Sequence, residues 1–358
     1  MLEPKLSICL PVYNQSTLLE WNLQQLIRCP IREIEIIVQD NCSTEDIQGL
    51  VAGIGDSRIR FFRNQQNLGH DRSIIRSFRN SRSRFAFLLR TSDTVYPEKI
   101  EEIIRFTEKN PLVGYCRFSC RDENGRSRLT FPNRIYPKGI EAARAAGDLW
   151  MHPSGELYNL SYFSVADWDC LDAYMVREFS HPYRFVVDTM MRMKLSTIAD
   201  LATGSEVVWQ YTYTVNRKDA AETGAKDRTC VYAPEYLYDR YRCEMRYVLQ
   251  EIKSGEKEIL IDNLIRQYAK AAVFTFKYLN RNKAMQNHYR YEEVPFSSRE
   301  ELKRFREVTG NLAEEAEEPY RTQILRKLSG IGEQTLVKWY MERLGQAACS
   351  RIRQIGSN

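Results

Sequence analysis

Three side chains in the first 97 residues follow short apolar runs and could bind a nucleotide: Tyr13, Asp40 and Asp93. Runs of this kind are typical of strands that are buried on both faces of a parallel sheet. Ligands of such sheets bind outside the carboxyl ends of the strands, so the three side chains would share one crevice. The pattern therefore favours a nucleotide-binding enzyme.

Four motifs occur in a fixed order: Pro11-Val12-Tyr13-Asn14, Asp40-Asn41-Cys42-Ser43, Asn67-Leu68-Gly69 and Thr91-Ser92-Asp93. Together they resemble the family 2 glycosyltransferases of the GT-A fold, in which such elements surround an activated sugar nucleotide. The specific match covers about residues 5–110, and a weaker one extends to about 220. The resemblance implies inverting transfer of a sugar from a nucleotide-diphosphate donor, a UDP-sugar, to a glycan or lipid-linked hydroxyl in surface polysaccharide biosynthesis.

Alternating strand and helix signals must position these motifs. Strands are expected at Leu6–Leu10, Glu35–Val38, Ile59–Phe62 and Phe85–Leu89. This alternation predicts an α/β fold, which in the GT-A form is a Rossmann-like mixed sheet flanked by helices. We expect a nucleotide-sugar-binding half, a less regular acceptor-binding and catalytic half, and an appended helical domain, at residues 1–115, 116–232 and 233–358.

The donor residues each have a structural alternative. Asp40 can accept a hydrogen bond from the ring N–H of uracil or thymine, or it can cap the following helix. Tyr13 is a stacking face for the base or a plain turn residue, and the backbone at Pro11 would lie along base and ribose. Asp71 reaches the ribose or caps its own helix, and the neighbouring Arg72 could approach phosphate. Asn67 enters the site only through the resemblance.

Asp93 is the candidate metal ligand, because Mn²⁺ and Mg²⁺ prefer carboxylate and phosphate oxygens. In the family that the chain resembles, two acids flank a variable residue. Here the aligned triplet is Thr91-Ser92-Asp93, so a hydroxyl replaces the first acid. The resemblance still implies that Asp93 binds the cation and that Thr91 and Ser92 line the donor. The lost acid keeps a second hypothesis open, a nucleotide-sugar-binding protein without catalysis.

The acceptor site is expected further along the chain. Trp150, His152 and Ser154 combine an aromatic ring, an imidazole and a turn, which suits sugar binding; the alternative is a core tryptophan beside an ordinary turn. Asp188 follows an apolar run at the start of a helix pattern. The resemblance implies that it is the catalytic base, and a helix N-terminus favours its ionised form. The alternative for Asp188 is a simple N-cap, and His181, Asp167 and Asp169 are the next candidates for the base.

Two basic segments remain. Arg217 or Lys218 could neutralise the leaving diphosphate from a loop that closes over the donor, or that loop is simply solvated. Residues 263–291 contain no acid and carry several Lys and Arg. They predict either a packed helix with a cationic outer side or a peripheral contact with an anionic membrane. The membrane contact leads to a third hypothesis, in which the protein is a scaffold recruited to the membrane.

Composition limits the remaining possibilities. The chain has 358 residues, 43% hydrophobic and 28% charged, which is ordinary for a globular protein with more than one part. The net charge of +5 is too small to indicate nucleic acid by itself. Nine scattered cysteines without zinc-type spacing favour a reduced, cytoplasmic protein. No signal peptide and no membrane-spanning run is expected.

Overall fold

The structure is a computed structural model that describes residues 3–148, 154–177, 186–212, 234–253, 255–281, 298–332 and 335. The chain divides into two compact units, Met1–Lys226 and Asp227–Asn358. Each unit is described by itself. The predicted nucleotide-site residues and Asp188 all belong to the first unit.

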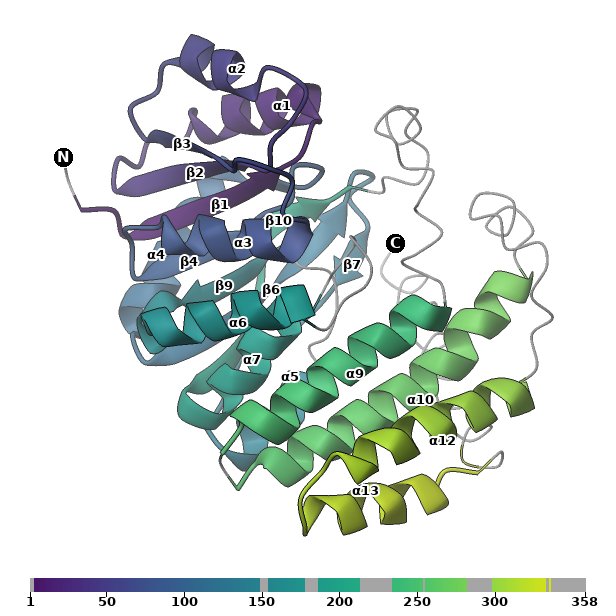
Figure 1. Ribbon diagram of the computed structural model, residues 1–358. Helices are drawn as coiled ribbons and strands as arrows, with labels where there is room; N and C mark the ends of the chain where they lie inside the picture. Colours follow the sequence, from purple (N-terminus) through teal and green to yellow (C-terminus); the bar gives the residue numbers. More distant parts are fainter. Residues whose placement is uncertain are drawn as a thin grey trace. The chain divides into compact units, whose positions relative to one another are not determined.

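The described part of the first unit is built on a ten-stranded sheet (Figure 1). Its main path runs in the order β3-β2-β1-β4-β9-β6-β10-β5, while β7 pairs with β6 and β8 pairs with β10. The strands are β1 Leu6–Val12, β2 Ile34–Asp40, β3 Ile59–Arg63, β4 Phe85–Leu88, β5 Thr94–Val95, β6 Val113–Asp122, β7 Ser127–Leu129, β8 Arg134–Tyr136, β9 Glu156–Asn159 and β10 Asp200–Tyr211.

The direction of the strands defines one functional edge. β1 is parallel to β2 and β4, β2 is parallel to β3, and β6 is parallel to β10. β9 lies between β4 and β6 and is antiparallel to both. The carboxyl ends of the parallel strands therefore meet at the edge where β9 begins. The predicted mixed sheet is confirmed, and this is the edge at which ligands of parallel sheets bind.

Helices cover both faces of the sheet. Buried side chains of α1, α2 and α4 form one core with alternate residues of β1 and β2, such as Leu23, Ile47 and Ile103 against Ile8 and Ile36. On the other face, α3 and α6 lie side by side (Figure 1) and α5 packs with α7. The bounds are α1 Ser16–Leu26, α2 Ile47–Ile54, η1 Pro97–Lys99, α4 Ile100–Lys109, α3 His70–Arg79, α5 Ile140–Asp148, η2 Leu160–Tyr162, α6 Val165–Arg177 and α7 Val187–Ile198.

Local sequence features mark the starts of two helices in the N-terminal part. Asp46 is the N-cap of α2 and accepts a 2.8 Å hydrogen bond from the amide of Gly49. Pro97 opens η1, which leads into α4. The stretch after residue 116 is more regular than we expected from the sequence. Most of α7 is buried, including residues on all of its sides, and such a helix shows no polar stripe by which to recognise it.

A buried charge cluster joins β6, β9 and α7. The carboxylate of Glu156 on β9 lies 2.7 Å from the guanidinium of Arg117 and 3.3 Å from that of Arg192. The hydroxyl groups of Tyr115 and Tyr158 donate hydrogen bonds to the same carboxylate at 2.9 and 2.6 Å. All five side chains are essentially inaccessible to solvent. One carboxylate thus compensates two buried cations from two other elements.

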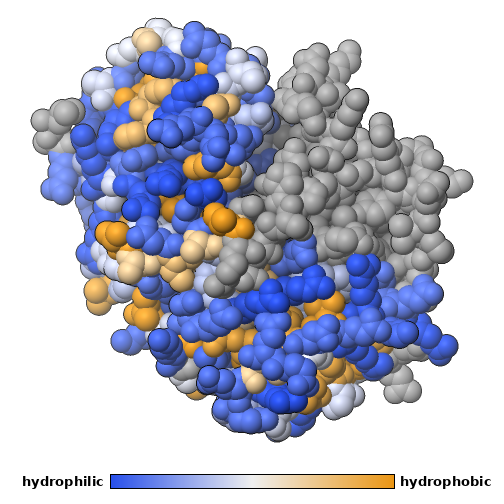
Figure 2. Space-filling view, in the orientation of Figure 1, coloured by the Kyte–Doolittle hydropathy of each residue, from blue (hydrophilic) through white to orange (hydrophobic). Residues whose placement is uncertain are grey.

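The second unit is helical in its described part. It contains α9 Pro234–Glu251, α10 Lys257–Arg281, α12 Ser298–Glu314 and α13 Tyr320–Ser329. Its core includes Tyr241, whose ring lies 4.7 Å from that of Tyr268 and 5.6 Å from that of Phe305. On the face shown in Figure 2, hydrophobic residues gather between the helices and hydrophilic ones cover their outer sides. None of the described helices is both long and apolar enough to cross a bilayer.

The Glu156 cluster leads to a prediction about stability. Glu156→Gln removes the negative charge and leaves Arg117 and Arg192 buried without full compensation, which should lower the free energy of unfolding by about 3–5 kcal/mol. Chemical denaturation measures this loss. Glu108→Gln is the control, since Glu108 pairs with Lys5 at 2.9 Å on an exposed surface and should cost no more than about 1 kcal/mol. Equal losses for the two variants would contradict the assigned role of Glu156.

Candidate active site

The loop after β1 is fastened to the loop after β2. Asn14 and Gln15 have left-handed backbone conformations, with φ of 56° and 66°. The amide of Asn14 donates to the hydroxyl of Ser43 at 2.7 Å, and the amide of Gln15 donates to the carboxylate of Glu45 at 3.1 Å. The two strand ends are thereby held in one crevice. Tyr13, at the start of the first loop, is 39% exposed and can offer a ring face to a ligand.

Asp40 ends β2 and pairs in register with Val12 of β1. Its carboxylate accepts a 2.9 Å hydrogen bond from the amide of Ser43 and forms an ion pair with Arg63. Arg63 also donates to the carbonyl of Ser43 at 2.8 Å. Asp40 is not the cap of the next helix, because Asp46 has that role. Asp40 itself has no exposed surface, whereas the side chain of Arg63 is 40% exposed.

Asn41 holds the loop that contains Asn67. The side-chain amide of Asn41 donates to the side-chain oxygen of Asn67 at 2.7 Å and to the carbonyl of Gly69 at 3.2 Å. Its own oxygen accepts from the amide of Leu68 at 2.9 Å. Gly69 has a φ of 83°, which strains any residue with a side chain. The loop is therefore shaped by Asn41 and Gly69, and it delivers the chain into α3.

Asp71 lies in the first turn of α3, and its carboxylate binds the start of another helix. One oxygen accepts hydrogen bonds from the amides of Val186 and Val187 at 2.8 and 3.2 Å, at the N-terminus of α7. Asp71 is 1% exposed and does not cap its own helix. The adjacent Arg72 forms a two-pronged ion pair with Asp172 of α6, at 2.7 and 2.8 Å, so its guanidinium is engaged there.

The residues 91–93 follow β4 at the same edge of the sheet. The hydroxyl of Thr91 donates to the side-chain oxygen of Gln15 at 2.5 Å, and its carbonyl accepts from the side chain of Asn22 at 2.7 Å. The hydroxyl of Ser92 accepts from the guanidinium of Arg90 at 2.8 Å. Both hydroxyl side chains are nearly buried. The Thr91 hydroxyl links the residues after β4 to the loop after β1.

Asp93 is buried completely and satisfied by three neighbours. The hydroxyl of Ser154 donates to one carboxylate oxygen at 2.6 Å, the amide of Thr212 donates to the other at 2.9 Å, and the Nε of Arg90 lies 3.9 Å away. Burial raises the pKa of the Asp93 carboxyl, although Arg90 and the Ser154 hydrogen bond act in the opposite direction. Ser154, expected at the acceptor, is thus fully buried beside Asp93 and does not line an open face.

The donor atoms at Asp93 fit a divalent cation only as a site with one carboxylate. In the part of the chain that the structure describes, no three His, Cys, Asp or Glu side chains form a group that could hold a metal. One carboxylate suffices when a diphosphate and water supply the other oxygens. Because Asp93 has no exposed surface, a cation reaches it only if Ser154 or Thr212 moves aside.

Asp188 lies in the first turn of α7, which begins one residue earlier at Val187. It is 6% exposed, and one of its oxygens is 3.9 Å from the guanidinium of Arg192. The other two aspartates considered as the base, Asp167 and Asp169, have structural partners. Asp167 binds Ser164 and Lys194 at the start of α6, and Asp169 pairs with Arg79 at 2.7 Å. Among these three aspartates, Asp188 is therefore the one that is nearly buried at the N-terminus of a helix.

Several predicted residues lie outside the described residues. For the acceptor these are Trp150 and His152, and for the second candidate base His181. Arg217 and Lys218, expected to neutralise the diphosphate, also lie outside. Their roles stay predictions.

The structure adds neighbours that we did not predict. Arg63 is the last residue of β3 and stands opposite Asp40 in the register of β2 and β3. Aligning the two strand ends in the sequence would have placed it at the same edge. The contact of Ser154 with Asp93 has no such sequence signal, because it depends on β9 running antiparallel beside β4.

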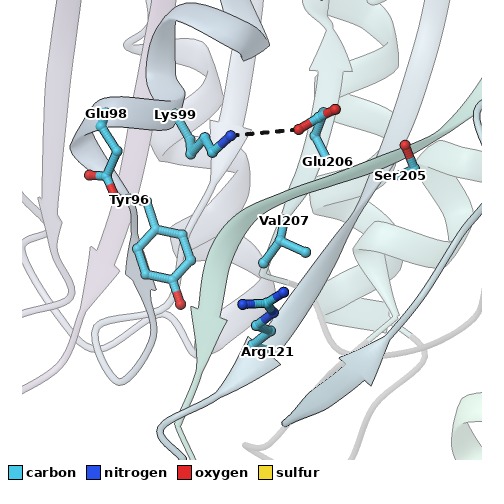
Figure 3. Close-up of a pocket in the computed structure, with 7 residues that line it drawn as sticks. All are labelled: Tyr96, Glu98, Lys99, Arg121, Ser205, Glu206 and Val207. Atoms are coloured by element: carbon cyan, nitrogen blue, oxygen red, sulfur yellow. Dashed lines mark ion pairs between the residues drawn. The ribbon is translucent and has the colours of Figure 1, made fainter. Parts of the chain in front are cut away.

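An open groove of about 410 Å³ lies between η1, β6 and β10 (Figure 3). Tyr96, Arg121 and Val207 lie on one side of it, and Lys99 forms an ion pair with Glu206 at 3.7 Å. No predicted site residue lines this groove, whose lining is Tyr96, Glu98, Lys99, Arg121, Ser205, Glu206 and Val207.

Known proteins resemble this chain in sequence. The family model "Glycosyl transferase family 2" matches residues 7–164. An uncharacterised glycosyltransferase of Haemophilus influenzae is 26% identical over 140 residues, which are 39% of this chain and 47% of that protein. A GalNAc(5)-diNAcBac-PP-undecaprenol beta-1,3-glucosyltransferase of Campylobacter jejuni is 36% identical over 64 residues, 17% of this chain and 21% of that protein. The chain thus spans less than half the length of these two relatives.

A solved structure resembles the chain over most of its length. The crystal structure of S. aureus TarS 1-349 in complex with UDP-GlcNAc has a TM-score of 0.59 at 14% sequence identity, and the match covers 94% of this chain and 92% of that one. At this identity the likeness shows the fold. The model of glycosyl transferase family 2 matches residues 7–164 of this chain, and the architecture of the chain is the GT-A fold with C-terminal helices that the sequence motifs predicted.

Proposed function

We propose that the chain is an inverting glycosyltransferase that moves a sugar from a UDP-sugar to a hydroxyl of a glycan or lipid-linked acceptor. The observation that carries the proposal is the meeting of Asp40 and the residues 91–93 at one edge of the sheet, where nucleotides bind in such folds. TarS, which shares the fold, binds UDP-GlcNAc. A role in surface polysaccharide biosynthesis is part of the same proposal.

Asp40 and Arg63 are suited to form hydrogen bonds with a uracil base. The ring N–H of uracil stands beside a carbonyl oxygen, so it matches a neighbouring acceptor and donor. Asp40 supplies the acceptor and Arg63 the donor, once Arg63 turns part of its exposed guanidinium toward the base. Tyr13 would stack on the ring, and the backbone at Pro11 and the loop at Asn67 would border the nucleotide. Guanine also has a ring N–H beside a carbonyl oxygen, so the proposed preference for UDP over GDP rests on the likeness to TarS, whose structure contains UDP-GlcNAc.

Asp188 is the proposed base. Its carboxylate takes the proton from the acceptor hydroxyl while that oxygen attacks the anomeric carbon. The bond from the anomeric carbon to the diphosphate oxygen breaks on the opposite side, UDP leaves with the bonding pair, and the configuration inverts. Asp188 lies in the first turn of α7, so the fold places its carboxylate at the N-terminus of that helix.

Charge on the diphosphate needs neutralising when UDP leaves. Asp93 would hold a divalent cation, Mn²⁺ or Mg²⁺, whose positive charge would neutralise the diphosphate when the cation is bound. Arg90, which lies beside Asp93 and binds Ser92, adds a fixed positive charge at the same place. Arg217 is a further candidate for the same purpose, and Trp150 and His152 are candidates for acceptor contacts.

A second candidate function is donor binding without transfer. Asp40 and Asp93 both have no exposed surface in this structure, and the first acid of the metal motif is Thr91. A nucleotide-sugar-binding protein would need only part of the site. Peripheral membrane contact through the basic helices of the second unit is a separate proposal, because Arg266 and Lys270 of α10 belong to the acid-free run.

The uracil assignment predicts a ligand-dependent shift in melting temperature. UDP should raise the melting temperature of the wild type more than GDP does, and Asp40→Ala should abolish the shift because the acceptor for the ring N–H is lost. Asp200→Ala is a matched control: Asp200 accepts a 2.8 Å hydrogen bond from the amide of Lys138 at the start of β10, on the opposite edge. Equal UDP shifts in wild type and Asp40→Ala would remove Asp40 from the site.

The buried position of Asp93 predicts how the cation binds. Mn²⁺ alone should leave the melting temperature unchanged, because one enclosed carboxylate is too weak a site, whereas Mn²⁺ should add to the shift caused by UDP. Asp93→Ala should remove this addition, and Thr91→Asp should increase it by restoring the second acid. UDP binding that is the same in chelator and in Mn²⁺ would show that no cation takes part.

The base assignment predicts a loss of turnover without a loss of donor binding. Asp188→Asn keeps the shape but cannot accept the proton, so turnover of the UDP-sugar should fall by about 10²- to 10⁴-fold while the UDP-induced melting shift survives. Asp169→Asn, in an exposed ion pair, is the control. If Asp188→Asn retains turnover and His181→Ala abolishes it, the base is His181.

A further inference from the structure

A path of hydrogen bonds and covalent chain connections runs from the proposed nucleotide site to the helix that carries the proposed base. It starts at Asn41, which directly follows Asp40 and holds the loop 67–69. That loop leads into α3, whose second residue is Asp71. Asp71 binds the amides of Val186 and Val187, and Asp188 is the next residue along α7. The path thus joins residues that are more than 100 positions apart in the chain.

The contact at Asp71 has the properties of a helix cap supplied from another helix. The first amides of a helix have no partner within it, so a side-chain oxygen at that place is strongly favoured. α7 has no side-chain cap of its own, since its N-cap residue is Val186. Asp71 is buried, and its second oxygen lies 3.2 Å from Nδ1 of His70, which also restrains the carboxylate.

The cap sets the position of Asp188. Capping determines where the first turn of a helix lies, and Asp188 is in the first turn of α7. The opposite side of Asp188 faces Arg192, which is itself held by Glu156 and by the carbonyl of Ala146 at 3.1 Å. Asp71 restrains the backbone just before Asp188, and Arg192 restrains the side chain of Asp188.

We propose that Asp71 is a positioning residue for catalysis, which holds the base Asp188 in place from the donor-binding half of the domain. The inference rests on the proposed function, and it differs from our sequence-based expectation of a ribose contact. Asp71 acts through the α7 amides and not through the donor. Removing it should therefore change the rate of transfer and leave the affinity for the nucleotide intact.

The test compares kcat and KM for hydrolysis or transfer of the UDP-sugar on which the wild type acts. A misplacement of about 1 Å costs on the order of 10²-fold in rate, so Asp71→Ala should lower kcat by about 10- to 100-fold with KM unchanged. Asp71→Asn keeps an accepting oxygen and should recover much of the rate. Asp46→Ala is the matched control, since Asp46 also caps a helix through one side-chain oxygen, at an exposed site.

Each outcome either supports or overturns the proposed positioning role of Asp71. A kcat of Asp71→Ala equal to that of Asp46→Ala, after correction for the folded fraction, would overturn the proposal. Loss of the UDP-induced melting shift in Asp71→Ala would place Asp71 on the donor and overturn it as well. If the wild type turns over no UDP-sugar, the proposed function fails. Hydrogen exchange then decides about the cap, because Val186 and Val187 should lose protection in Asp71→Ala and keep it in Asp46→Ala.

Discussion

The ion cluster around Glu156 is the interaction on which the first unit depends most. β9 runs antiparallel between two groups of parallel strands. The carboxylate of Glu156 on this strand binds both Arg117 of β6 and Arg192 of α7. Charges buried in this way are tolerated only when they are paired and hydrogen-bonded, so the cluster specifies one arrangement of these elements. The same strand begins next to Ser154, which brings that hydroxyl to Asp93.

The two carboxylates of the donor edge are both engaged inside the protein. Asp40 is paired with Arg63, and Asp93 is enclosed by Ser154, Thr212 and Arg90. Under the proposed function, a donor would replace these internal partners with its own groups, and the cost of that exchange would reduce its binding energy. A ligand that supplies a ring N–H, a diphosphate and a cation together would then bind better than any one of them alone.

The two halves of the domain are connected at Asp71. Its carboxylate belongs to α3, which follows the loop held by Asn41, and its partners belong to α7, which carries Asp188. Donor binding and proton transfer are usually assigned to separate sets of residues. In the mechanism we propose, a single buried carboxylate links the two sets, and the alignment of acceptor and donor would depend on a contact that touches neither of them.

The sequence alone determined the alternating strands and helices and the edge shared by Asp40 and Asp93, because these follow from local periodicity and from the rule that parallel strands end together. Tertiary structure decided the partners of the buried charges. That Ser154 meets Asp93 and that Asp71 caps α7 depends on strands and helices distant in the chain. No local pattern encodes such contacts, since a carboxylate has the same local preferences whichever donor the fold brings to it.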